Sequence, residues 1–93
     1  MLRLNKDYLY FYKKICSSNL PASAVSVYKA ILQYANRKTW SCFPSVNTIA
    51  RDTKLSQRTV RRQIFLLVEK EYLLRIPRRR ENNGYTSNMY FFN

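Results

Sequence analysis

The stretch PSVNTIARDTKLSQRTVRRQIFLLVEK, residues 44–70, decides the fold because it holds two amphipathic segments separated by a short turn. The first segment is expected to form a helix from about Val46 to Thr53. Ser45 stands where an N-cap would accept a hydrogen bond from an otherwise unpaired backbone N–H. Helical spacing predicts that one side of this helix is buried, and that side consists of Val46, Ile49, Ala50 and Thr53.

The second segment is expected to form a helix over residues 57–70, with Ser56 as its N-cap. Each helical residue advances about 100° around the axis. Val60, Ile64 and Leu67 therefore line one face, which we expect to be buried. Lys54 and Leu55 form the turn between the helices, with Leu55 pointing into the core.

The polar face of the second helix has the composition of a helix that reads DNA bases in the major groove. Arginine can pair with the guanine edge and glutamine with the adenine edge. The candidate base readers are Gln57, Arg58, Arg61 and Arg62. Arg61 lies closer to the buried stripe, so part of its bonding is expected to be intramolecular or to phosphate. The candidate phosphate or capping groups beside the helix starts are Ser45, Ser56 and Thr59. An ordinary amphipathic helix with a solvated basic face is the alternative.

Composition restricts the partners. The chain has 93 residues, enough for one domain with a modest core, and 46% of them are apolar. Lys and Arg number 17 against 5 acidic residues, a formal charge of +12 that favours a polyanion such as nucleic acid. A ribosomal or membrane-surface protein would share this charge. No apolar run approaches the roughly 20 residues of a membrane helix, and the N-terminus lacks the features of a signal peptide.

The residue inventory argues against an enzyme. There is no histidine, which removes His-based triads and His–metal sites. Gly84 is the only glycine, so a glycine-rich phosphate loop is excluded, and the five acidic residues are scattered. Cys16 and Cys42 have no metal-ligand spacing and are expected to be free thiols. We therefore expect no catalytic activity, no metal and no cofactor. The chain has room for no effector domain, so no small-molecule effector is expected either.

The segments before the two helices are expected to support them. The aromatic run from Asp7 to Lys13 predicts a strand, followed by a short helix over residues 14–18. Residues 1–19 would form an extension packed on the body, which comprises residues 20–93. A scaffold helix is predicted from Ala22 to Asn36, and a small strand within residues 39–43. The predicted buried stripe of the scaffold helix consists of Ala24, Val27, Tyr28, Ile31, Leu32 and Ala35.

After residue 70 the pattern changes to that of a β-hairpin. Leu74 and Ile76 alternate with polar residues, Pro77 indicates a sheet edge, and residues 85–92 return as a second strand. Asn83-Gly84 between them is a strong hairpin signal. Basic and polar residues at the tip are expected to contact phosphates or a minor groove, and these are Arg78, Arg79, Arg80 and Asn82.

The segment FPSVNTIARDTKLSQRTVRRQI resembles the helix-turn-helix of bacterial winged-helix regulators. The ending SNMYFF is similar to the last wing strand of helix-turn-helix domains in plasmid and phage replication initiators and in DnaD-like proteins. The resemblance covers about residues 20–92. It implies an α+β winged helix-turn-helix domain, with a three-helix core and a C-terminal β-hairpin wing, that binds double-stranded DNA in replication initiation or transcription regulation. GntR-type regulators share the core motif. It also implies a protein encoded by a bacterium, phage or plasmid. The lack of a membrane helix and of a signal peptide predicts that the protein is cytoplasmic.

Three features depart from that pattern. Lys54 stands in the turn and Glu71 after the second helix, where the family often has glycine; both positions favour a left-handed backbone. Phe65, Leu66 and Val68 are apolar where such helices are often polar. We expect them to widen the buried face beneath the N-terminal strand.

Other functions stay open at this point. The tyrosines at 8, 10 and 12 would serve an RNA or single-strand binder as stacking platforms. Alternatively, the winged helix would act as a protein-interaction module. Self-association or a replisome or regulatory partner would then use Phe65, Leu66 or the N-terminal aromatic strand. Arginines on both the second helix and the wing favour DNA.

Overall fold

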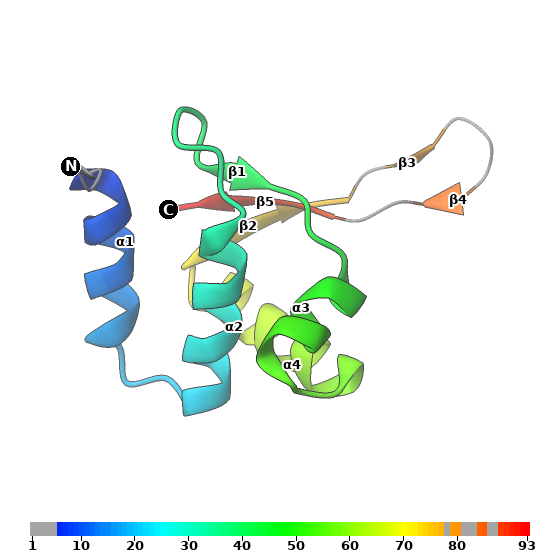
Figure 1. Ribbon diagram of the computed structural model, residues 1–93, viewed down its shortest axis with the longest axis horizontal. Helices are drawn as coiled ribbons and strands as arrows, with labels where there is room; N and C mark the ends of the chain where they lie inside the picture. Colours follow the sequence, from blue (N-terminus) through cyan, green and yellow to red (C-terminus); the bar gives the residue numbers. More distant parts are fainter. Residues whose placement is uncertain (1–5, 78, 81–83, 86–87) are drawn as a thin grey trace.

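The computed structural model describes residues 6–77, 79–80, 84–85 and 88–93. They form four helices and two small antiparallel sheets, an α+β winged-helix arrangement (Figure 1). In chain order the elements are α1 (Lys6–Cys16), α2 (Ala22–Gln33), β1 (Ser41–Cys42), α3 (Val46–Thr53), α4 (Gln57–Glu69), β2 (Leu73–Ile76), β3 (Arg79–Arg80), β4 (Gly84–Tyr85) and β5 (Met89–Phe92).

The core forms where α2 packs against α1, α3 and α4. The predicted stripe of α2, from Ala24 to Ala35, is buried throughout. The helix ends at Gln33, three residues before the predicted Asn36, because the N–H groups of Tyr34 and Ala35 bond to carbonyls three residues back and tighten the last turn. The predicted buried face of α4 is confirmed, since Val60, Ile64 and Leu67 are buried. On the predicted face of α3, Ile49 and Ala50 are buried, whereas Val46 and Thr53 are half-buried.

The larger sheet has the order β1-β5-β2, with antiparallel pairing throughout. Leu73 lies opposite Phe92, and Arg75 lies opposite Tyr90. Leu73, Tyr90 and Phe92 are buried on the face that meets the helices, whereas Leu74 and Ile76 are exposed on the other face. Figure 1 shows this sheet edge-on, with α2, α3 and α4 on one side of it. Strands are present within the predicted ranges 39–43 and 74–76. In the predicted strand 85–92, Tyr85 belongs to β4 and Met89–Phe92 form β5, while residues 86–87 lie outside the described residues.

The N-terminal prediction was wrong: one helix, α1, replaces the expected strand over Asp7–Lys13 and the short helix after it. Phe11 and Ile15 are buried in the common core, and the Phe11 ring lies 5.5 Å from that of Phe92. Aromatic residues favour strands by only about 1 kcal/mol or less, and packing readily overrides that preference. Phe11 and Ile15 are four residues apart, so a helix places both on the core side.

Two left-handed residues confirm the predictions made from the missing glycines. Lys54 has φ 62° and ψ 27° after α3, and Glu71 has φ 65° after α4. The Glu71 N–H donates to the Val68 carbonyl and the Tyr72 N–H to the Leu67 carbonyl, which is the paired-bond termination that usually uses glycine. A third left-handed residue, Trp40 at φ 52°, was not predicted.

Lys54→Gly is expected to raise the free energy of unfolding by about 0.5–1 kcal/mol. Glycine removes the steric cost of the left-handed backbone, and this gain exceeds the stability lost because glycine increases the entropy of the unfolded chain. The matched control is Lys70→Gly, at a position where φ is negative, −86°. That control should lower stability. Urea unfolding of the two variants without nucleic acid measures both values, and equal destabilisation by both would contradict the argument.

Candidate nucleic-acid interface

Both helices of the helix-turn-helix begin with the same cap. Ser45 Oγ accepts the Thr48 N–H at 3.0 Å and donates to Thr48 Oγ1 at 2.9 Å. Ser56 Oγ accepts the Thr59 N–H at 3.1 Å and donates to Thr59 Oγ1 at 2.9 Å. Both predicted N-caps are confirmed.

This cap changes which hydroxyls are suited to a phosphate. The hydrogens of Ser45 and Ser56 are already donated, whereas the threonine oxygens that accept them keep their own hydrogens for a phosphate oxygen. Thr59 was among the predicted phosphate groups, but Thr48 was missed. The Ser-x-x-Thr spacing, which occurs at the start of both helices, is the sequence signal that could have identified Thr48 together with Thr59.

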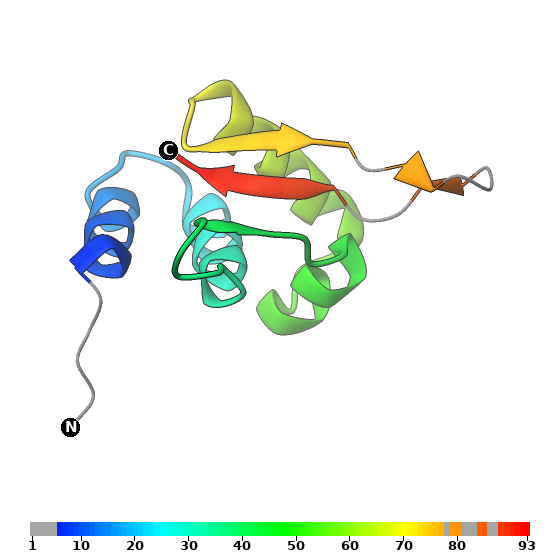
Figure 2. The same cartoon turned by 90° about the horizontal axis from the view of Figure 1, so that it is seen from above.

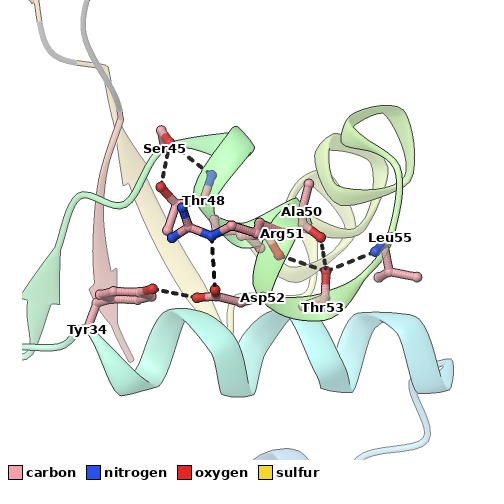
Figure 3. Close-up of polar contacts among 9 residues, drawn as sticks. Tyr34, Ser45, Thr48, Ala50, Arg51, Asp52, Thr53 and Leu55 are labelled. Atoms are coloured by element: carbon pink, nitrogen blue, oxygen red, sulfur yellow. Dashed lines mark hydrogen bonds and ion pairs between the residues drawn. The ribbon is translucent and has the colours of Figure 1, made fainter.

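The turn between α3 and α4 is held by side-chain bonds. Thr53 Oγ1 donates to the Ile49 carbonyl at 2.7 Å and accepts the Leu55 N–H at 3.4 Å (Figure 3). Leu55 is half-buried against the core, as predicted. These bonds tie the turn to α3 and so restrain the start of α4.

Tyr34 and Asp52 join the end of α2 to α3, which sequence reasoning did not anticipate. The Tyr34 hydroxyl donates to Asp52 Oδ2, and Arg51 Nε lies 3.7 Å from Asp52 Oδ1 (Figure 3). The hydrogen bond to Asp52 raises the pKa of the Tyr34 hydroxyl above its usual value. Arg51 keeps 74% of its side chain exposed. Asp52 therefore fixes α3 against the scaffold helix while Arg51 adds positive charge to the surface.

The solvent side of α4 is basic over its first turns. Arg58, Arg61 and Arg62 are exposed, as predicted, and Phe65 is 57% exposed beyond them. Arg58 and Arg62 form no hydrogen bond or ion pair with any described residue, so their guanidinium donors remain available for a ligand.

Gln57 and Arg61 are already engaged within the protein. Gln57 Nε2 donates to Asn47 Oδ1 at 3.2 Å, and Arg61 Nη2 donates to Gln57 Oε1 at a long 3.5 Å. The predicted intramolecular bonding of Arg61 is thus present. Asn47 was not singled out from the sequence, since a contact between two helices leaves no local pattern. It orients Gln57 from α3.

The wing is represented by β3 and β4, which pair with Arg79 opposite Tyr85 and Arg80 opposite Gly84. Arg78 and Asn82, two of the predicted contacts, lie outside the described residues, as does Asn83 of the predicted turn. β3 and β4 lie beyond the ends of β2 and β5, toward the side of the molecule that holds α3 and α4 (Figures 1 and 2). Helix α1 lies at the opposite end.

The N-terminal tyrosines are engaged by cations of the same chain. The Arg37 guanidinium carbon lies 4.2 Å from the centre of the Tyr8 ring, and Lys29 Nζ lies 4.8 Å from that of Tyr12. Lys14 Nζ is 5.7 Å from the Tyr10 ring. Tyr8 also stacks on Tyr12 at 6.3 Å, while Tyr10 remains 57% exposed.

The cysteines are separate thiols. Cys16 is exposed, and burial raises the pKa of the Cys42 thiol to about 12. Within residues 6–77, 79–80, 84–85 and 88–93, no group of three or more His, Cys, Asp or Glu residues could hold a metal. In the same residues no helix has the length and apolar character to cross a membrane.

A family model described as a helix-turn-helix domain matches residues 18–73, which include α2, α3 and α4. No curated protein and no solved structure matches the chain.

Proposed function

Because the chain belongs to the helix-turn-helix domain family, we propose that it binds double-stranded DNA in a sequence-specific manner, with α4 in the major groove. The wing, residues 78–84, would lie on the phosphate backbone or in the adjacent minor groove. We further propose that it acts as a binding protein and not as an enzyme, without a cofactor. It would serve replication initiation or transcription regulation, as the resemblance to replication initiators and GntR-type regulators implies.

The observation that carries this proposal is the arrangement of α4. Its apolar face is held by the core, and its N-terminal turns present Arg58 and Arg62 with unpaired guanidinium donors. Gln57 stands beside them, oriented by Asn47. A planar donor fork on a fixed helix suits the guanine edge, which offers two acceptors side by side.

The wing supports the same partner through charge. Replacing the three arginines at 78–80 with alanine is expected to flatten the slope of log affinity against log salt concentration by roughly two to three units. Each phosphate neutralised by a protein cation contributes about 0.9 to that slope. The measurement is fluorescence anisotropy on one labelled duplex at several salt concentrations.

A control with the same loss of charge is Lys13, Arg37 and Lys38→Ala. All three residues are exposed, and none is on the helix-turn-helix or the wing. This control should keep most of the slope. An unchanged slope in the wing variant would remove the wing from the interface. Tighter binding of the wild type to a single strand of the same sequence would instead favour the single-strand alternative.

A further inference from the structure

Phe65 occupies an unexpected place on α4. Leu66 and Val68 are half-buried against the core and widen the buried face as predicted, but Phe65 is 57% exposed. Helix α1 does not cover it, because α1 packs against α2. No described aromatic ring stacks on Phe65. The expectation of burial was therefore wrong for Phe65, and its exposure needs another reason.

The helix places Phe65 on the same side as the arginines. Seven residues at about 100° each bring Phe65 to within about 20° of the direction of Arg58. Arg62 lies about 60° away from Phe65, and Arg61 about 40° away on the other side. Phe65 thus lies in the middle of the basic face, about 10 Å along the axis from Arg58.

The arginines around Phe65 favour DNA over an apolar protein surface as the partner of this side chain. A protein partner that covered Phe65 would also desolvate Arg58, Arg61 and Arg62, and burying unpaired charge is costly. In the major groove the same arginines meet acceptors and phosphates. The groove also contains one apolar feature that a phenyl ring can contact, the C5-methyl group of thymine.

We propose that Phe65 is a specificity-determining residue that reads a thymine methyl group in the major groove. This inference rests on the proposed function. An axial separation of about 10 Å corresponds to about three base-pair steps of 3.4 Å. The thymine is therefore expected about two to four base pairs from the base contacted by Arg58, when the helix axis follows the groove.

The test uses the full chain and a duplex selected from a random pool. Each thymine in turn is replaced by deoxyuridine, which removes the methyl group and keeps the base pairing. At one position the wild type should lose affinity by about fourfold, the value expected for one buried methyl group. Phe65→Ala should bind the thymine and deoxyuridine duplexes equally.

Tyr10→Ala is the matched control, because Tyr10 is also 57% exposed but lies on α1. It should keep the wild-type preference for thymine. Absence of any methyl-sensitive position in the wild type would overturn the inference, and this arm needs no protein variant. A methyl preference that persists in Phe65→Ala would overturn it as well. Failure of the wild type to bind any duplex would instead overturn the proposed function itself.

Discussion

Replacing Ile64 with alanine is expected to lower the free energy of unfolding by about 2–5 kcal/mol, the usual cost of truncating a buried branched side chain. Ile64 is 2% exposed, on a helix that packs against α2, α3 and β2. The loss combines the transfer of the removed methyl groups with the cavity left behind. Small domains are stable by only about 5–15 kcal/mol, so urea unfolding will resolve the change easily.

Arg58→Ala on the same helix is the control for this experiment. Its side chain is exposed and makes no bond to any described residue, so the melting temperature should stay close to that of the wild type. Together the two variants separate the face that stabilises the domain from the face available to a ligand. Substantial unfolding of Arg58→Ala would mean that the two faces of α4 are misassigned.

The second large effect is expected in DNA binding. Arg58→Ala and Arg62→Ala should each weaken binding to the preferred duplex by about 1–3 kcal/mol and relax the preference at one or two base positions. Gln57→Ala should act similarly, although this substitution also removes the hydrogen bond from Gln57 to Asn47. Anisotropy titrations against a panel of single-base substitutions in the selected site measure both the affinity and the preference.

Changes in the wing provide the comparison for that panel, since phosphate contacts weaken all duplexes about equally. A uniform loss across the panel for the α4 variants would make α4 a phosphate clamp. The protein would then be an architectural binder with little sequence preference.

Local signals in the sequence were sufficient to predict the helix-turn-helix. The caps at Ser45 and Ser56 follow from hydroxyl residues directly before apolar periodic segments, and both form. The left-handed backbone at Lys54 and Glu71 follows from the resemblance to a pattern with glycine at those positions. In each case the information lies within a few residues of the structure that it determines.

The incorrect and missed predictions depend on contacts between residues that are far apart in the sequence. Helix α1 was predicted as a strand because its aromatic residues suit strands locally, whereas its helical state depends on packing Phe11 against distant Trp40 and Phe92. The bonds from Tyr34 to Asp52 and from Gln57 to Asn47 also join different helices. Contacts of this kind become visible only when the helices are placed relative to one another.

The central position of β5 has a consequence for synthesis of the protein. β1 and β2 both pair with β5 and not with each other, although β5 follows them in the sequence. On the ribosome, α2, α3 and α4 therefore leave the exit tunnel and can meet while neither earlier strand has a partner. The Phe92 ring packs against Phe11 at 5.5 Å and Tyr28 at 5.2 Å, so these two core rings lack that partner until Phe92 emerges. Translation that stalls before residue 89 would thus leave a helical nascent chain with exposed apolar surface, which chaperones and proteases recognise.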